Sequence, residues 1–189
     1  MMIMIKRIMI LKIVLFSILL GLAFSRYFIV GPAQIKVLNV VPCAEYHNQT
    51  MQFMLKGHMY NKSTQLLDGF LGIPDDLDKS VTMYMKASRV DKHKTQVNSF
   101  VINDSEACTS LNKYVGDLWL NIQTQIGMEP GFCPIKKGNY SVKNLVLDLS
   151  KLNVQMILEG VFKTRIIFKN QTKPIYCGDF TIELSPKND

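Results

Sequence analysis

Residues 81–87 (VTMYMKA) decide the fold class of this chain. Every second side chain is apolar, and the residues of this apolar set are Val81, Met83, Met85 and Ala87. The side chains between them are Thr82, Tyr84 and Lys86. A period of two residues is typical of an antiparallel β-strand with one face in the core and the other in water. We therefore predict a half-buried strand here.

The same alternation recurs on both sides of this strand. Residues 51–60, 161–168 and 176–184 alternate in the same way, and further candidate strands are 33–41, 97–102 and 140–149. Turn-forming residues separate the strands at 61–64, 72–78, 91–94 and 170–174. At least seven strands with short connections predict an all-β fold, an antiparallel β-sandwich or β-cup.

One segment departs from the period of two. Apolar side chains recur there at helical spacing, at Leu111, Val115, Leu118, Ile122 and Ile126, after a capping-box pattern at 103–106. This spacing predicts one short amphipathic helix over residues 106–125. The loop 127–131, which contains glycine and proline, is expected to end it.

The first 25 residues have the features of a cleavable signal peptide. Basic residues at positions 6, 7 and 12 precede an apolar run over 13–24, and small side chains stand at Ala23 and Ser25. The run is about a dozen residues long, whereas a membrane span needs roughly twenty. We expect a secreted, extracellular protein whose mature part, residues 26–189, is a single domain. Without the leader the formal charge falls from +7 to about +4, which is too small to indicate nucleic-acid binding.

Cysteines and sequons agree with export. The four cysteines, Cys43, Cys108, Cys133 and Cys177, predict two disulfides, and the residues alone leave all three pairings open. No two of them form the Cys-x-x-Cys pattern of zinc sites and thiol oxidoreductases. Five Asn-x-Ser/Thr sequons predict glycosylation at Asn48, Asn61, Asn103, Asn139 and Asn170.

The chain offers little for catalysis. The three histidines stand beside a sequon, on the polar side of a strand and in a charged turn, and are His47, His58 and His93. Each is expected in solvent rather than in a catalytic site. The carboxylates Asp75, Asp76 and Asp78 lack the ligand spacing of a calcium loop and are expected to form a polar turn. We predict a protein that is not an enzyme and uses no metal or cofactor.

Large and flexible apolar side chains are abundant, with 11 methionines and 10 phenylalanines. In a β-sandwich such residues fill an ordinary core. In a sandwich whose sheets stand apart, they line a cavity for acyl chains. Composition alone does not separate these two interpretations.

The segment 133–142 (CPIKKGNYSV) resembles the Cys-Pro-x-Lys-x-Gly-x-Tyr-Ser segment of the ganglioside activator protein, a member of the ML-type lipid-recognition group. Residues 160–163 (GVFK) are similar to that family's Gly-x-Tyr-Arg strand start, and Cys177 lies where its last strand carries a cysteine. With fewer cysteines than the ganglioside activator, the chain is most similar to the insect CheB chemosensory proteins, a divergent branch of the group.

This resemblance implies a β-cup that carries a lipid or similar amphiphile in an apolar cavity without altering it. It implies disulfides between Cys43 and Cys177 and between Cys108 and Cys133. The expected cavity residues lie on the apolar strand faces and are Phe53, Leu55, Met83, Met85, Phe100, Ile102, Phe162 and Ile166. Trp119 and Met128 are expected at the mouth, where loop residues contact a membrane surface or a receptor.

The expected function is therefore extracellular binding of a hydrophobic ligand, such as a lipid, cuticular hydrocarbon or pheromone, in contact chemosensation. The alternative, by likeness to the wider group, is an accessory protein that presents a lipid to a glycosidase or an innate immune receptor. Expression in gustatory or sensory-bristle tissue favours the first function, and expression in fat body, blood cells or lysosomes favours the second.

Overall fold

The computed structural model describes residues 28–29, 33–61, 64–147 and 157–186. The expected signal peptide, 1–25, and the last part of the strand expected at 140–149 lie outside the described residues. Within the described part, no helix is long and apolar enough to cross a membrane.

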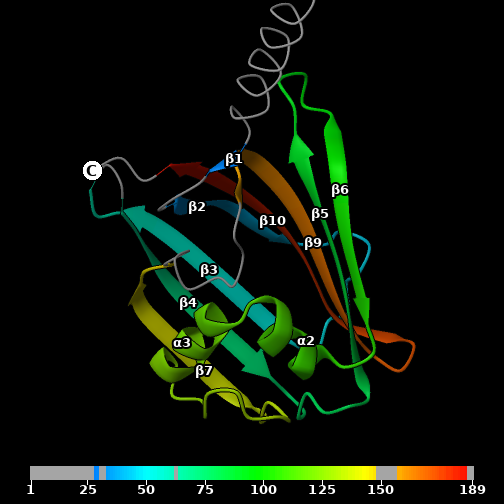
Figure 1. Cartoon of the computed structure of the whole chain (residues 1–189). Helices are drawn as coiled ribbons and strands as arrows, with labels where there is room; N and C mark the ends of the chain where they lie inside the picture. Colours follow the sequence, from blue (N-terminus) through cyan, green and yellow to red (C-terminus); the bar gives the residue numbers. More distant parts are fainter. Residues whose placement is uncertain (1–27, 30–32, 62–63, 148–156, 187–189) are drawn as a thin grey trace, which may run out of the picture.

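The chain folds into two antiparallel sheets that lie face to face (Figure 1). The larger sheet has the order β2–β10–β9–β5–β6, formed by Ala33–Pro42, Lys173–Pro186, Gly160–Asn170, Val81–Val90 and Gln96–Asp104. The smaller sheet has the order β3–β4–β7, formed by Gln52–Met59, Gln65–Ile73 and Gly138–Leu145. A separate two-residue pair joins β1 (Phe28–Ile29) to β8 (Ile157–Leu158). The prediction of an all-β antiparallel sandwich is confirmed.

One strand of the two main sheets was not predicted. All seven predicted stretches form strands, but the structure adds β4, whose sequence is QLLDGFLGI. The two-residue strands β1 and β8 were not predicted either. The adjacent leucines and two glycines of β4 break the alternation that identified the predicted strands. Because β4 is the central strand of the smaller sheet, two neighbouring ladders hold it in place. The turn expected at 72–78 accordingly begins inside β4, which ends at Ile73.

The helical segment forms two short helices, so the prediction of one helix over 106–125 is wrong. They are α2 (Ala107–Tyr114) and α3 (Asp117–Gln125). Gly116 lies between them with a φ of 57°, in the left-handed region that favours glycine, and this ends the first helical path. The capping box is wrong as well, because Glu106 is the N-cap residue and makes no side-chain capping bond.

The hydrophobic core lies at one end of the sandwich, which we call the closed end. Its buried members come from both sheets, both helices and the loop into β5, and include Ile73, Leu77, Val81, Met83, Trp119 and Phe168. Phe53 of β3 packs edge-on against Tyr176 of β10, with ring centroids 6.1 Å apart. This contact joins the two sheets. Each large apolar side chain buried in this way contributes about 1.5–3 kcal/mol to stability.

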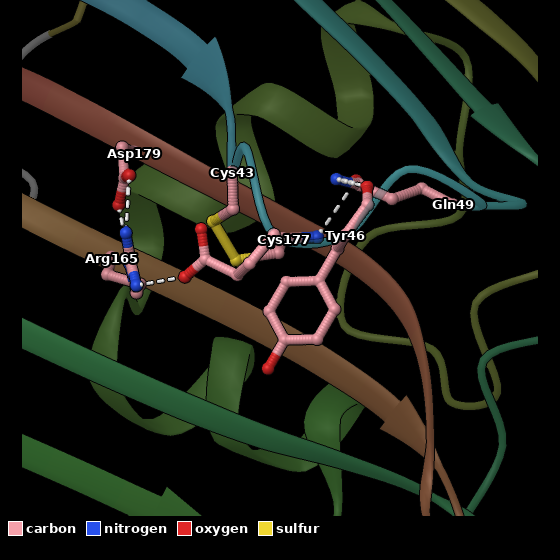
Figure 2. Close-up of a disulfide and its surroundings, with 7 residues drawn as sticks. Cys43, Tyr46, Gln49, Arg165, Cys177 and Asp179 are labelled. Carbon is pink, nitrogen blue, oxygen red and sulfur yellow. Dashed lines mark hydrogen bonds and ion pairs between the residues drawn. A yellow bond between two sulfur atoms is a disulfide. The ribbon is translucent and has the colours of Figure 1, made fainter.

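Both disulfides lie at the closed end. Cys43 is bonded to Cys177 and Cys108 to Cys133, which are the pairs that the family resemblance implies. The N–H of Cys43 also donates to the carbonyl of Cys177 at 3.1 Å, which extends the β2–β10 ladder. Next to the bond, the Gln49 Oε1 accepts the N–H of Cys177 at 2.9 Å (Figure 2). Residues 43–51 are thus fastened to β10 as the chain crosses from the larger sheet to the smaller one.

An ion-pair cluster covers the same crossing on the outer face of the larger sheet. Arg165 of β9 donates two hydrogen bonds of 2.7 Å to Asp179 of β10 and a third to Glu45 of the crossing segment (Figure 2). The hydrogen bonds to Asp179 raise the pKa of Arg165, so the guanidinium stays charged. Since the three side chains are 38–49% exposed, we expect each pair to contribute no more than about 1 kcal/mol.

The sheets meet differently along their two long sides. On one side the edge strands β2 and β3 are in contact. Gln65 of β4 accepts the N–H of Val37 at 2.8 Å and donates to the Val37 carbonyl at 3.0 Å, so its side chain pairs with β2 as a strand residue would. On the other side, α2 and α3 lie between the edge strands β6 and β7 (Figure 1).

Candidate functional site

The inner face of the larger sheet, the face that meets the smaller sheet, is mainly apolar along β9 and β10. Because successive side chains of a strand point to opposite faces, alternate residues of β9 share this face, and they are Phe168, Ile166, Thr164 and Phe162. The register places three residues of β10 opposite Phe168, Thr164 and Phe162, and they are Tyr176, Phe180 and Ile182.

Burial decreases along this inner face, away from the core. Phe168 is 6% exposed and lies in the core, Ile166 is half-buried against it, and Phe162 is half-buried beyond it. The smaller sheet changes in the same direction along β3, where Met51 is 6% exposed and Met59 is 48% exposed. The inner face of the larger sheet and the strand β3 therefore change from closely packed to partly exposed towards the same end of the sandwich. Leu67 of β4 and its partner Leu145 of β7 depart from this gradient, because they are only 1% and 3% exposed.

Gly69 places no side chain on the middle of the smaller sheet. It is paired with Leu55 of β3 and Val142 of β7, and a Cβ at this position would lie 3.2 Å from each of those two side chains. The leucine and the valine therefore close over the glycine and form an apolar surface. This surface and the outer part of the β9–β10 face make up what we call the open interior, whose residues are Leu55, Gly69, Val142, Phe162, Thr164 and Ile182.

The structure distributes the eight predicted cavity residues along this gradient. Two are buried in the core, Met83 and Ile102, and three are half-buried against it, Phe53, Met85 and Ile166. Leu55 and Phe162 belong to the open interior. Phe100 lies on the edge strand β6 and is 56% exposed.

The two predicted mouth residues lie at the closed end. Trp119 is only 9% exposed and is a member of the core, so the structure does not place it at a rim. Met128 packs against the core and lines a hollow of about 190 Å³ with Ile135 and Tyr140. The disulfide Cys108–Cys133 attaches the loop beside this hollow to α2.

Tyr176, a buried member of the aromatic core, carries a titratable phenol. Burial raises the pKa of Tyr176, and the nearby Asp179 carboxylate raises it further. The raised pKa keeps Tyr176 neutral over the physiological range. Because the neutral form is the one that the fold favours, this contribution to stability is present below about pH 10 and is lost at higher pH.

The histidines and the acidic turn bear on the question of catalysis. His47, His58 and His93 are all exposed, as expected. In the acidic turn, Asp76 accepts the N–H of Lys137 at 2.8 Å and pairs with the Lys136 ammonium at 3.0 Å. Among the described residues, no group of three His, Cys, Asp or Glu side chains is placed to hold a metal ion.

Sequence reasoning missed part of the open interior. Gly69 and Val142 were not predicted as site residues. The pairing of β4 with β3 and β7 places them there, and β4 has no alternating pattern. Thr164 and Ile182 share the inner face with predicted residues, and the period of two along β9 and β10 was the signal that could have identified them.

Comparison of the chain with protein-family models and with curated proteins found no match.

Proposed function

We propose that this protein is a secreted, non-enzymatic binding or carrier protein that holds the apolar part of a hydrophobic ligand in the open interior. The burial gradient along the inner face of the larger sheet and along β3 carries this proposal. Leu55 and Phe162 point into the sandwich yet stay half-buried, while Met51 and Phe168 at the closed end are each 6% exposed. A long-chain ligand between the sheets would cover the part that remains exposed.

The energetic reason is the hydrophobic effect. Covering apolar surface stabilises a complex by about 25 cal/mol for each Å² removed from water. Since the larger face supplies aromatic and β-branched side chains and the smaller face supplies leucine and valine, the contacts are apolar and non-directional. Such a surface suits an acyl or hydrocarbon chain better than a polar ligand.

The biological setting of the proposal follows from export and from the family resemblance. Two disulfides fit an oxidising compartment, and five sequons fit a cell-surface or extracellular environment. The resemblance to CheB proteins favours a lipid, cuticular hydrocarbon or pheromone as ligand and contact chemosensation as the process. A membrane surface or a receptor would then be the partner to which the ligand is delivered.

Uptake of a long-chain fluorescent probe by delipidated protein tests the proposal. We expect micromolar or tighter affinity. We also expect that filling the interior with Thr164→Trp weakens binding by at least about tenfold, which is about 1.4 kcal/mol. The matched control is Lys163→Trp, because Lys163 is the next residue of β9 and lies exposed on the outer face. Lack of uptake across several chain lengths, or equal effects of the two variants, would contradict the proposal.

A further inference from the structure

All five sequon asparagines are exposed, but they occupy two different kinds of position. Asn48, Asn61 and Asn170 lie outside regular strands or at the end of one, in the crossing segment and at two hairpins. Asn103 and Asn139 lie within β6 and β7, and both are exposed there. Asn103 is the penultimate residue of β6 and Asn139 is the second residue of β7. A residue of a regular strand is an unusual place for a sequon, because glycans are generally carried by surface loops.

The strands that carry Asn103 and Asn139 are the outermost strands on the same side of the sandwich. β6 is the last strand of the larger sheet and β7 is the last strand of the smaller one (Figure 1). An edge strand presents unpaired backbone N–H and C=O groups to a strand of another molecule, which makes it a site of self-association. The edge at β6 also exposes large apolar side chains, with Phe100 56% and Val101 50% exposed.

The opposite side of the sandwich is protected without sequons in its strands. There β2 and β3 contact each other, and the Gln65 side chain uses the N–H and the carbonyl of Val37. This contrast suggests that the edge strands on both sides need protection from self-association, and that this protection is provided in two ways. On one side the Gln65 side chain pairs with Val37 of the edge strand β2. On the other side α2 and α3 lie between β6 and β7 (Figure 1), and a modification is available on these two strands themselves.

Neither asparagine points into the ligand-binding interior. Asn103 is paired with Tyr84, and Tyr84 packs on the outer-face cluster around Cys43 and Cys177. Asn139 is paired with Gly72 and lines an open hollow of about 380 Å³ together with Gln52 and Lys137. Sugars on either asparagine would thus extend from the outer surface, away from the proposed binding interior.

We propose that Asn103 and Asn139 carry N-linked glycans that keep β6 and β7 from pairing with other copies of the chain. In this modification the side-chain amide nitrogen forms a bond to C1 of the first sugar of a lipid diphosphate-linked oligosaccharide. The bond from C1 to the diphosphate breaks, the diphosphate lipid leaves, and the amide nitrogen gives up one proton to the transferase. The inference rests on the export that the proposed function assumes and is independent of ligand binding.

The test compares two double variants secreted from a eukaryotic host. Asn103→Gln with Asn139→Gln removes the strand sequons, and Asn61→Gln with Asn170→Gln removes the same number of sequons at hairpins. Peptide mass spectrometry of the unaltered protein should find sugars on Asn103 and Asn139. Light scattering at equal concentration should show a monomer for the unaltered protein and the hairpin variant, and at least a doubled mass for the strand variant.

Further measurements keep the test decisive if the strand variant is poorly secreted. Ser105→Ala with Ser141→Ala destroys the same two sequons while leaving both asparagines in place. Enzymatic trimming of the folded hairpin variant removes the strand glycans after folding, and new hydrogen-exchange protection should then appear in β6 and β7. Bare Asn103 and Asn139 in the secreted protein would overturn the proposal. So would a strand variant that stays monomeric, or equal self-association of both double variants.

Discussion

The two ends of the sandwich are made from the same strands but differ in packing. At the closed end, β5, β9 and β10 meet the smaller sheet through interlocked large side chains, and both disulfides and both helices lie there. Towards the other end the same strands continue with apolar inner faces that are only half-buried. We expect the closed end to supply most of the stability of the fold, and we propose that the other end remains available for a ligand. The predictions below separate these two roles.

Loss of the disulfides should have the largest effect. The chain-entropy estimate for Cys43–Cys177, with a sequence separation of 134, is about 5 kcal/mol. For Cys108–Cys133, with a separation of 25, the same estimate is about 3.5 kcal/mol. Urea denaturation of C43A/C177A and of C108A/C133A should therefore show that the first double variant is the less stable. The reverse order would mean that the loop held by Cys108–Cys133 contributes more to the closed end than its length predicts.

Two phenylalanines on one strand provide the sharpest comparison of the ends. Phe168 and Phe162 share the inner face of β9, one in the core and one in the open interior. Phe168→Ala should lower the free energy of unfolding by about 3–5 kcal/mol, whereas Phe162→Ala should lower it by less than about 2 kcal/mol. When both variants are folded, Phe162→Ala should weaken probe binding more than Phe168→Ala does. Equal losses of stability would show that the open interior is ordinary core.

Ligand binding should stabilise the protein. With free probe at a hundred times its dissociation constant, the stability should rise by about 2.7 kcal/mol, if the probe binds only the folded chain. Hydrogen exchange should slow mainly in the strand segments around Phe162 and Leu55 and little around Phe168. If protection increased only at the closed end, the ligand would bind somewhere other than the open interior.

The smallest expected effect is the loss of stability at low pH that follows from protonation of Asp76. The N–H of Lys137 and then the Lys136 ammonium lower the pKa of the Asp76 carboxyl below its usual value of 3.8. A lowered pKa in the folded state adds stability above the unfolded pKa and loses it as pH falls through the folded value. The stability difference between wild type and Asp76→Asn should therefore be present at pH 6 and vanish in acid. The substitution Lys136→Ala should raise the pKa of Asp76 only part of the way to its usual value, because the backbone hydrogen bond from Lys137 remains. NMR titration of the variant measures this pKa.

Local sequence pattern predicted those parts of the fold in which one strand face is buried and the other is wet. This condition holds for β3, β5, β9 and β10, and these strands also supplied Leu55 and Phe162 of the candidate site. It fails for β4, since that strand is held by two neighbours. Gly69 therefore could not be predicted as part of the apolar surface. Its role depends on Leu55 and Val142, which only the sheet register brings together.

The helical segment shows a second limit of sequence reasoning. Apolar spacing runs without a gap from Leu111 to Ile126, so periodicity does not reveal the break at Gly116. The same spacing cannot tell a core tryptophan from one at a rim. The position of Trp119 was decided by how α3 lies across the closed end, which is a long-range property.

The Gln65 contact with Val37 has a consequence for the range of ligand sizes. In a closed barrel the circumference is set by an unbroken ladder, and widening it would require many backbone bonds to separate together. Here β2 and β3 belong to different sheets, and the Gln65 side chain bridges from the smaller sheet to β2 with two hydrogen bonds of about 1 kcal/mol each. A side chain can release and regain such bonds singly. In the proposed complex, release of these two bonds would let the sheets move apart along this side, so that ligands of different width could bind without disrupting either sheet.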